Sequence, residues 1–146
     1  MKKIVLFLFF IIILSSFVLG DTPISDCQGL YNIRNSPSEN YYLIQDIDCS
    51  SFGNFGMISS FSGNLDGWGH IVNGIYIERA STDDETALFK TLETGASITR
   101  IGLENIYIKS GSVGSIVYYN YGIISESFTT GFVESGVGWD AAGFVS

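Results

Sequence analysis

The fold is indicated most clearly by residues 101–108, which read Ile-Gly-Leu-Glu-Asn-Ile-Tyr-Ile. Related short apolar segments occur at 72–77 and 127–133. Two further series of the same character are formed by residues 87–89, 114–117 and 142–145, and by residues 95–98 and 122–124. Matched positions lie about 26 to 29 residues apart, and glycine or Asn-Gly separates the segments, as tight turns require. The sequence therefore predicts a repeat protein.

Few repeat architectures combine very short strands with no helices between them. Leucine-rich repeats need a Leu and Asn ladder, which is absent, and helical repeats are incompatible with the many glycines between residues 53 and 74. A parallel β-solenoid fits, because stacked coils bury apolar faces that no single coil can bury. We therefore predict an all-β fold with coils over residues 41–146. Its expected core residues are Ile75, Ile77, Leu103, Ile106, Ile108, Phe128 and Val133.

Glycine and polar residues between positions 61 and 71 predict a tight repeat turn formed by Gly63, Asp66, Gly67, Gly69 and His70. We expect its three glycines to adopt positive φ. The side chains of Asn64 and Asp66 are expected to accept hydrogen bonds from turn amides. Asn73 and Asn105 occupy comparable places in two coils, which predicts that they stack in a polar ladder.

The same turn carries a family resemblance. Residues 61–71, Phe-Ser-Gly-Asn-Leu-Asp-Gly-Trp-Gly-His-Ile, preceded by residues 42–49, resemble the opening coils of secreted right-handed β-helix proteins with GLUG motifs. Residues 122–133 followed by 142–145 are similar to a GLUG repeat, although Ala142 and Ser146 stand where the family usually has glycine. The resemblance covers roughly residues 25–146 and implies a right-handed parallel β-helix. It implies no single activity, because such turns occur in both binding and polysaccharide-cleaving proteins.

Residues 1–20 are predicted to be a cleaved signal peptide. Lys2 and Lys3 precede an unbroken apolar run of 11 residues, and small residues precede an expected cut before Asp21. The alternative is a membrane anchor, but the run is shorter than the roughly 20 residues that a span needs. We therefore expect a secreted or cell-surface protein with no membrane span after signal removal.

Residues 21–40 are predicted to form an N-terminal capping segment with one short helix. Ser25 or Asp26 can cap this helix, and Pro37 follows its expected end. Residues 41–49 are rich in aromatic and β-branched side chains, so they are expected to be extended.

The two cysteines, Cys27 and Cys49, lie 22 positions apart. An even number of cysteines in a secreted chain favours a disulfide, and two separate buried thiols are the alternative. Two cysteines cannot build a tetrahedral zinc site, and the single histidine is distant in sequence.

The expected mature chain is strongly acidic. Signal removal takes away two lysines and no acids, so the formal net charge changes from -8 to -10. This charge argues against a nucleic-acid partner, because affinity for phosphates comes from clustered Lys and Arg.

Catalysis by a polysaccharide-cleaving enzyme would depend on Asp46, Asp48, Asp66 and His70. Asp46 and Asp48 would share one strand face, as an acid pair requires. No Lys or Arg lies near enough in sequence to act as a lyase base. The acidic run at 83–85 is interpreted as a solvated loop, with a weak calcium site as the alternative. No catalytic residue, metal site or cofactor is therefore assigned.

Three functions stay open. The first is binding or adhesion to a glycan or a cell-surface protein, with sugars stacking on Tyr76, Tyr107, Tyr118, Tyr119 and Tyr121. The second is a polysaccharide lyase or hydrolase, and the third is a structural fragment of a larger adhesin-like protein. Residues 143–146 would end the last coil within a repeat, so we expect either a longer protein or self-association through this uncapped coil.

Overall fold

The structure is a computed structural model and describes residues 20–80 and 85–136. Strands dominate these residues, and helical structure is confined to α2 (Cys27–Asn32) and the following 3₁₀ helix η1 (Ile33–Asn35). The predicted all-β class and the short N-terminal helix are therefore confirmed. The predicted signal peptide except Gly20, the final coil at 143–146, and Asp83 and Asp84 lie outside the described residues.

The strands are short and follow one another with turns between them. Their bounds are β1 (Thr22–Ile24), β2 (Tyr41–Leu43), β3 (Ile47–Asp48), β4 (Ile58–Phe61), β5 (Asn64–Asp66), β6 (Ile71–Asn73), β7 (Tyr76–Glu78), β8 (Glu85–Thr86), β9 (Phe89–Leu92), β10 (Ser97–Thr99), β11 (Gly102–Ser110), β12 (Ser112–Val113), β13 (Val117–Asn120), β14 (Ile123–Ser125) and β15 (Phe128–Ser135).

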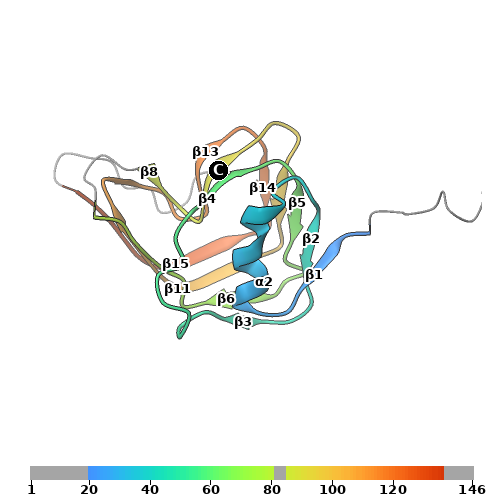
Figure 1. Ribbon diagram of the computed structural model, residues 1–146, viewed down its shortest axis with the longest axis horizontal. Coiled ribbons are helices and arrows are strands. Elements are labelled where there is room, and N and C mark those ends of the chain that lie inside the picture. The colour runs from blue at the N-terminus through green and yellow to red at the C-terminus, as the bar shows by residue number, and fades with distance from the viewer. Residues whose placement is uncertain (1–19, 81–84, 137–146) are drawn as a thin grey trace, which may run out of the picture.

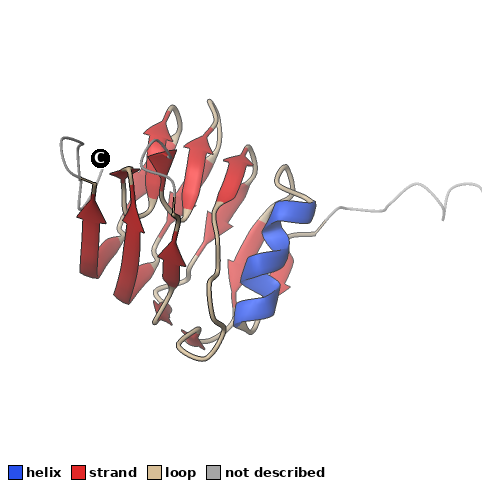
Figure 2. Cartoon of the chain, turned by 60° about the vertical axis from the view of Figure 1, so that its left-hand side comes forward, coloured by secondary structure: helices blue, strands red, loops and turns tan. Residues whose placement is uncertain are grey.

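Strands that are distant in sequence pair side by side, and each pairing between these strands is parallel. Sheet A has the order β1-β2-β5-β10-β14, and sheet B has the order β15-β11-β6-β3, with β7 also paired to β11. The smaller sheets are β13-β9-β4 and β12-β8. The sheets curl around one interior (Figure 1). One circuit of the chain around this interior is called a pass, and successive passes lie next to one another along the molecule (Figure 2).

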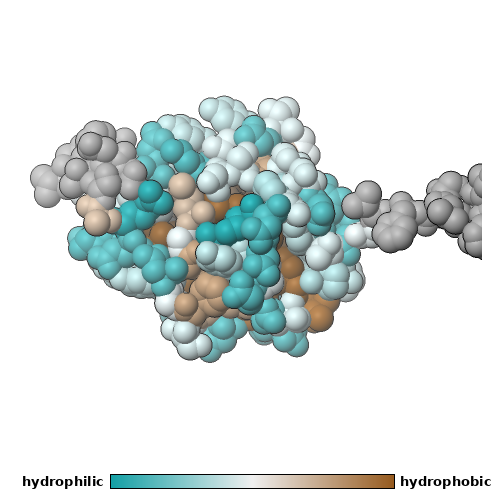
Figure 3. Space-filling model, in the orientation of Figure 1, coloured by the Kyte–Doolittle hydropathy of each residue, from teal (hydrophilic) through white to brown (hydrophobic). Residues whose placement is uncertain are grey.

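Helix α2 lies across one end of these curled sheets (Figure 1). The helix begins after Asp26, whose Oδ1 accepts the Gly29 N–H at 2.7 Å. Two residues of the helix, Cys27 and Leu30, are buried. Its outer surface is hydrophilic, with apolar atoms visible at its margins (Figure 3). The helix therefore shields the first pass from water.

The predicted disulfide is confirmed. Cys27 at the start of α2 is bonded to Cys49, and their Cα atoms are 5.3 Å apart. Both residues are buried in the core. The bond ties the covering helix to the chain just after β3.

The expected extended segment 41–49 is interrupted in the structure. Its two ends form β2 and β3, which belong to different sheets. The chain changes direction at residues 44–46, so the segment forms a corner rather than one strand.

Five of the predicted core residues are at most 2% exposed: Ile75, Ile77, Leu103, Ile106 and Ile108. Val133 is partly buried and packs against the same core. The prediction for Phe128 is wrong, because this side chain is 45% exposed. Phe128 pairs with Gly102, and Thr129 pairs with the buried Leu103, so strand alternation places Phe128 on the outer face.

The three predicted turn glycines have two different roles. Gly69 has a φ of +83°, as expected, but Gly63 and Gly67 do not adopt positive φ. A Cβ at Gly63 would lie 1.9 Å from the Glu39 carbonyl oxygen, and one at Gly67 would lie 2.4 Å from the Arg100 carbonyl oxygen. These two glycines are required by close contact between neighbouring passes.

No helix within residues 20–80 and 85–136 has the length and apolar character needed to cross a membrane.

Candidate functional site at the repeat turn

The predicted repeat turn is the corner between β5 and β6. Asp66 ends β5, and its Oδ1 accepts the Trp68 N–H at 2.9 Å. The Gly67 N–H donates to the Thr99 carbonyl in the next pass at 2.8 Å. The Asp66 cap is therefore confirmed. Asn64 instead forms side-chain hydrogen bonds with Asn40 and Ser97, so its predicted capping role is wrong.

Asp66 also forms an ion pair with Arg100 in the next pass. The Arg100 Nε donates to Asp66 Oδ1 at 3.0 Å, and Nη2 donates to Oδ2. Burial raises the pKa of Asp66, but hydrogen bonds from Arg100 and the Trp68 amide outweigh this effect and leave the pKa below its usual value. The turn therefore holds an ionised carboxylate against a guanidinium at neutral pH.

A second polar pair joins the same corner to the preceding pass. The Nδ1 of His70 lies 3.1 Å from Asp46 Oδ1. This oxygen also accepts the Ile71 N–H at 3.0 Å. The Ile71 amide, followed by His70, lowers the pKa of Asp46. His70 thus has the predicted turn role and contacts one of the candidate acids.

Between these pairs, the structure places an exposed tryptophan that the sequence interpretation did not single out. Trp68 has a φ of 52° and is 58% exposed. Its ring lies 4.9 Å from the Tyr42 ring at an interplanar angle of 33°. Tyr42 therefore supports one face of the indole, and the remaining surface is open to solvent. The separation of 26 positions between Tyr42 and Trp68, close to the repeat length, could have indicated this pair.

Asp46 and Asp48, considered as candidates for an acid pair, do not lie on the same strand. Asp46 precedes β3, whereas Asp48 ends it and accepts hydrogen bonds from the Ser50 amide and the Asn73 side chain. The Asn105 side chain donates to Asn73 Oδ1 at 2.7 Å, which confirms the predicted polar ladder. These carboxylates therefore stabilise turns and stacked passes. Within the described residues, no cluster of His, Cys, Asp and Glu could hold a metal ion.

The aromatic residues proposed for sugar stacking are arranged differently from one another. Tyr76 and Tyr107 have ring centroids 5.2 Å apart, Tyr107 and Phe132 have centroids 5.5 Å apart, and both pairs have an interplanar angle of 15°. Tyr107 therefore has a neighbour on each face and is a poor platform for a sugar. The Tyr118 and Tyr119 rings meet edge to face. The Tyr119 hydroxyl donates a hydrogen bond to the Glu85 carboxylate, and this bond is the main cause that raises the Tyr119 pKa to about 12.

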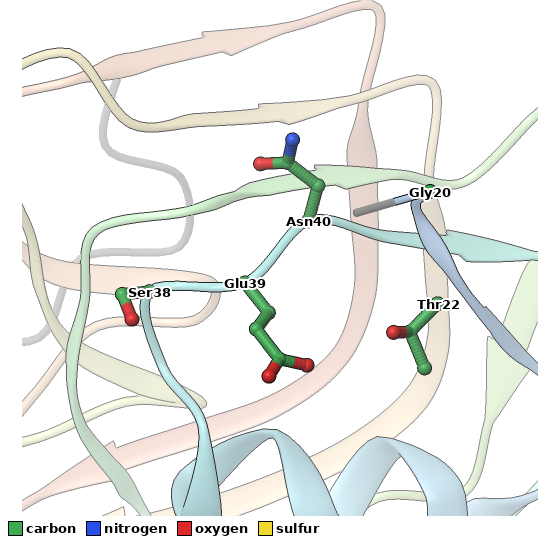
Figure 4. A pocket seen from close by; sticks show the side chains of 5 residues that line it. All are labelled: Gly20, Thr22, Ser38, Glu39 and Asn40. Carbon is green, nitrogen blue, oxygen red and sulfur yellow. The ribbon is translucent and has the colours of Figure 1, made fainter. Parts of the chain in front are cut away.

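A pocket of about 400 Å³ lies elsewhere, between the start of β1 and the segment before β2 (Figure 4). Its lining residues are Gly20, Thr22, Ser38, Glu39 and Asn40. Gly20 belongs to the predicted signal peptide, so the expected cleavage would remove part of the wall. The pocket is therefore a weaker candidate than the repeat turn.

Comparison with known proteins gives one partial match. The chain is 28% identical over 126 residues to Halomucin from Haloquadratum walsbyi, and the alignment covers 75% of this chain. The chain spans about 1% of the length of this curated relative. No protein-family model and no solved structure matches the chain.

Proposed function

We propose that this chain is a secreted binding protein on a right-handed parallel β-helix with GLUG-like repeats. The parallel pairing of strands from successive passes supports the β-helix. The disulfide between Cys27 and Cys49 supports export to an oxidising compartment. The signal-like sequence at residues 1–20 is consistent with the same compartment.

We further propose that the repeat turn binds a glycan, and the observation that carries this proposal is Trp68. Aromatic ring faces pack against the apolar C–H face of a sugar ring, while the sugar hydroxyls need polar partners. Trp68 offers such a face, supported from behind by Tyr42. Asp66, Arg100 and His70 lie in the same corner and its neighbouring pass and can exchange hydrogen bonds with hydroxyls.

The preferred glycan class is neutral. The mature chain carries a formal charge of -10, which disfavours acidic polysaccharides at low ionic strength. The Arg100 guanidinium is already paired with Asp66, so a ligand carboxylate would have to compete for it. Neutral hexose polymers avoid both costs.

A glycan array probed with the secreted chain tests this proposal. We expect neutral hexose polymers to bind, and Trp68→Ala to reduce the signal by at least tenfold. Phe132→Ala is the matched control, because Phe132 is an aromatic residue that is 52% exposed and lies on β15 of sheet B, whereas the turn follows β5 of sheet A. Binding that survives Trp68→Ala, or that is lost equally in the control, would overturn the assignment of the site.

A second candidate is a structural segment of a longer adhesin-like protein. The partial match to Halomucin favours this reading, because the aligned stretch is 1% of that protein. The polysaccharide-cleaving alternative receives less support, because Asp46, Asp48 and Asp66 are each engaged in turn hydrogen bonds.

A further inference from the structure

The sequence contains one Asn-Gly step, Asn73-Gly74, and Asn73 is the last residue of β6. Such a step is chemically labile, because glycine has no Cβ to hinder its nitrogen from reaching the preceding side chain. The Gly74 nitrogen attacks Cγ of Asn73 and loses its proton, a C–N bond forms, and the side-chain amide gains a proton and leaves as ammonia. Water then opens the resulting succinimide at one of its two carbonyl groups, which gives aspartate or isoaspartate.

The structure holds the Asn73 side chain between the preceding pass and the following pass. Its Nδ2 donates to Asp48 Oδ1 at 3.1 Å, and its Oδ1 accepts from Asn105 Nδ2 at 2.7 Å. The Asn73 carbonyl oxygen also accepts the Cys49 N–H at 2.7 Å. The electrophilic Cγ is therefore fixed by hydrogen bonds from both sides.

The attacking nitrogen is held in the same way. The Gly74 N–H donates to the Glu104 carbonyl of the following pass at 2.9 Å. A Cβ at Gly74 would lie 2.9 Å from the Ser50 Cα atom, so the glycine backbone packs closely against the preceding pass. The nitrogen must break its hydrogen bond and leave this packing before it can reach Cγ of Asn73.

We propose that Asn73 is a latent deamidation site, which the ladder of Asp48, Asn73 and Asn105 keeps unreactive while the passes stay together, and whose reaction weakens sheet B. The rate of modification then follows the fraction of molecules in which the passes beside β6 have opened locally.

The expected damage follows from the register of sheet B. Asn73 pairs with Asp48 on β3 and with Glu104 on β11, so its neutral amide lies between two acidic residues. Aspartate at this position adds a third carboxylate to the row, and like charges at paired positions destabilise a sheet. Isoaspartate adds one atom to the backbone between β6 and β7, which displaces the Gly74 amide from the Glu104 carbonyl.

The first test compares the folded chain with the unfolded chain. The disulfide-bonded protein is incubated in mildly alkaline buffer with and without guanidinium, and peptide mass spectrometry measures aspartate and isoaspartate at position 73. We expect the reaction to be at least tenfold slower in the folded chain. Equal rates in the two states would overturn the proposal.

A variant of the ladder tests what protects the site. Asn105→Gly removes the amide that donates to Asn73, and glycine fits the φ of 50° at this position without added strain. The rate in the folded chain should rise about fivefold, as expected for loss of one hydrogen bond. Asn64→Ala is the matched control, because the Asn64 amide joins passes in sheet A instead. An unchanged rate in Asn105→Gly, or an equal rise in the control, would show that the ladder does not protect Asn73.

The charge change is tested by two further variants at neutral pH. Asn73→Asp should have a lower melting temperature than Asn73→Ser, which loses the same amide but adds no charge. Added salt should narrow the difference, because it screens repulsion from Asp48 and Glu104. Equal melting temperatures of the two variants at low salt would overturn the inference that deamidation weakens sheet B.

Discussion

Within residues 20–80 and 85–136, four residues other than glycine adopt positive φ: Trp68, Arg100, Asn105 and Glu126. This conformation costs a residue with a Cβ about 1–2 kcal/mol relative to the right-handed region. Glycine would fit the backbone at Trp68 with less strain. The Trp68 backbone is therefore held in an unfavourable conformation, in which its N–H donates to Asp66, while the indole lies against the Tyr42 ring and remains exposed.

The glycines of the turn give a direct test at the residue scale. Gly63→Ala should prevent stable folding, because the new methyl group would overlap the Glu39 carbonyl oxygen at 1.9 Å. Gly69→Ala should cost only about 1 kcal/mol, since its Cβ meets no atom within 4 Å and only the positive φ is unfavourable. Denaturant unfolding of both variants measures the difference. Equal stability of the two variants would contradict the close packing of passes at Gly63.

The ionised turn carboxylates predict a fall in stability at acidic pH. Folding lowers the pKa of Asp66 below its ordinary value. The carboxylate therefore contributes its full stabilisation above the ordinary pKa and loses it as the pH falls through the lower pKa of the folded chain. The melting temperature should therefore drop more steeply below pH 4 in the unmodified chain than in Asp66→Asn. Parallel pH profiles for the two proteins would show that the Arg100 pair contributes nothing to this dependence.

At the scale of elements, the covering helix depends on its covalent bond to the first pass. Helix α2 has only six residues, which is too short to be stable alone in water. Asp26, Leu30 and the Cys27–Cys49 bond together fix it on the end of the sheets. The helix and β3 should therefore lose stability together when the bond is removed.

Replacing both cysteines by serine tests this coupling. With a sequence separation of 22 residues, loss of the bond should lower the free energy of unfolding by about 3 kcal/mol in the chain-entropy model. Guanidinium unfolding at neutral pH measures the change. An unchanged midpoint would mean that the helix docks independently of the disulfide.

For the whole molecule, the sequence predicted the parts that depend on local pattern. The repeat of apolar segments located Ile75, Leu103 and Ile108 in the core, because matched apolar positions of successive segments pack into the same interior. Asp26 and the cysteines were also recognisable from helix capping and secretion. Phe128 was misplaced because it precedes the inward position by one residue, and a shift of one residue reverses the face.

The candidate site was harder to predict, because its contacts join different passes of the chain. Asp66 and Arg100 are separated by 34 positions, and Asp46 and His70 by 24. These two spacings differ, so no single repeat length predicts both pairs. Recognising that Trp68 lies on Tyr42 requires the register between β2 and β5, which the structure supplies.

We expect Trp68 to contact a neutral glycan, and the fluorescence of this residue measures such a contact most directly. The chain has two tryptophans, so Trp139→Phe leaves Trp68 as the single reporter. When this variant is titrated with a neutral glycan identified on the array, Trp68 emission should shift to shorter wavelength and become less accessible to acrylamide. A glycan that binds with unchanged Trp68 emission and quenching would contradict a contact between Trp68 and the glycan.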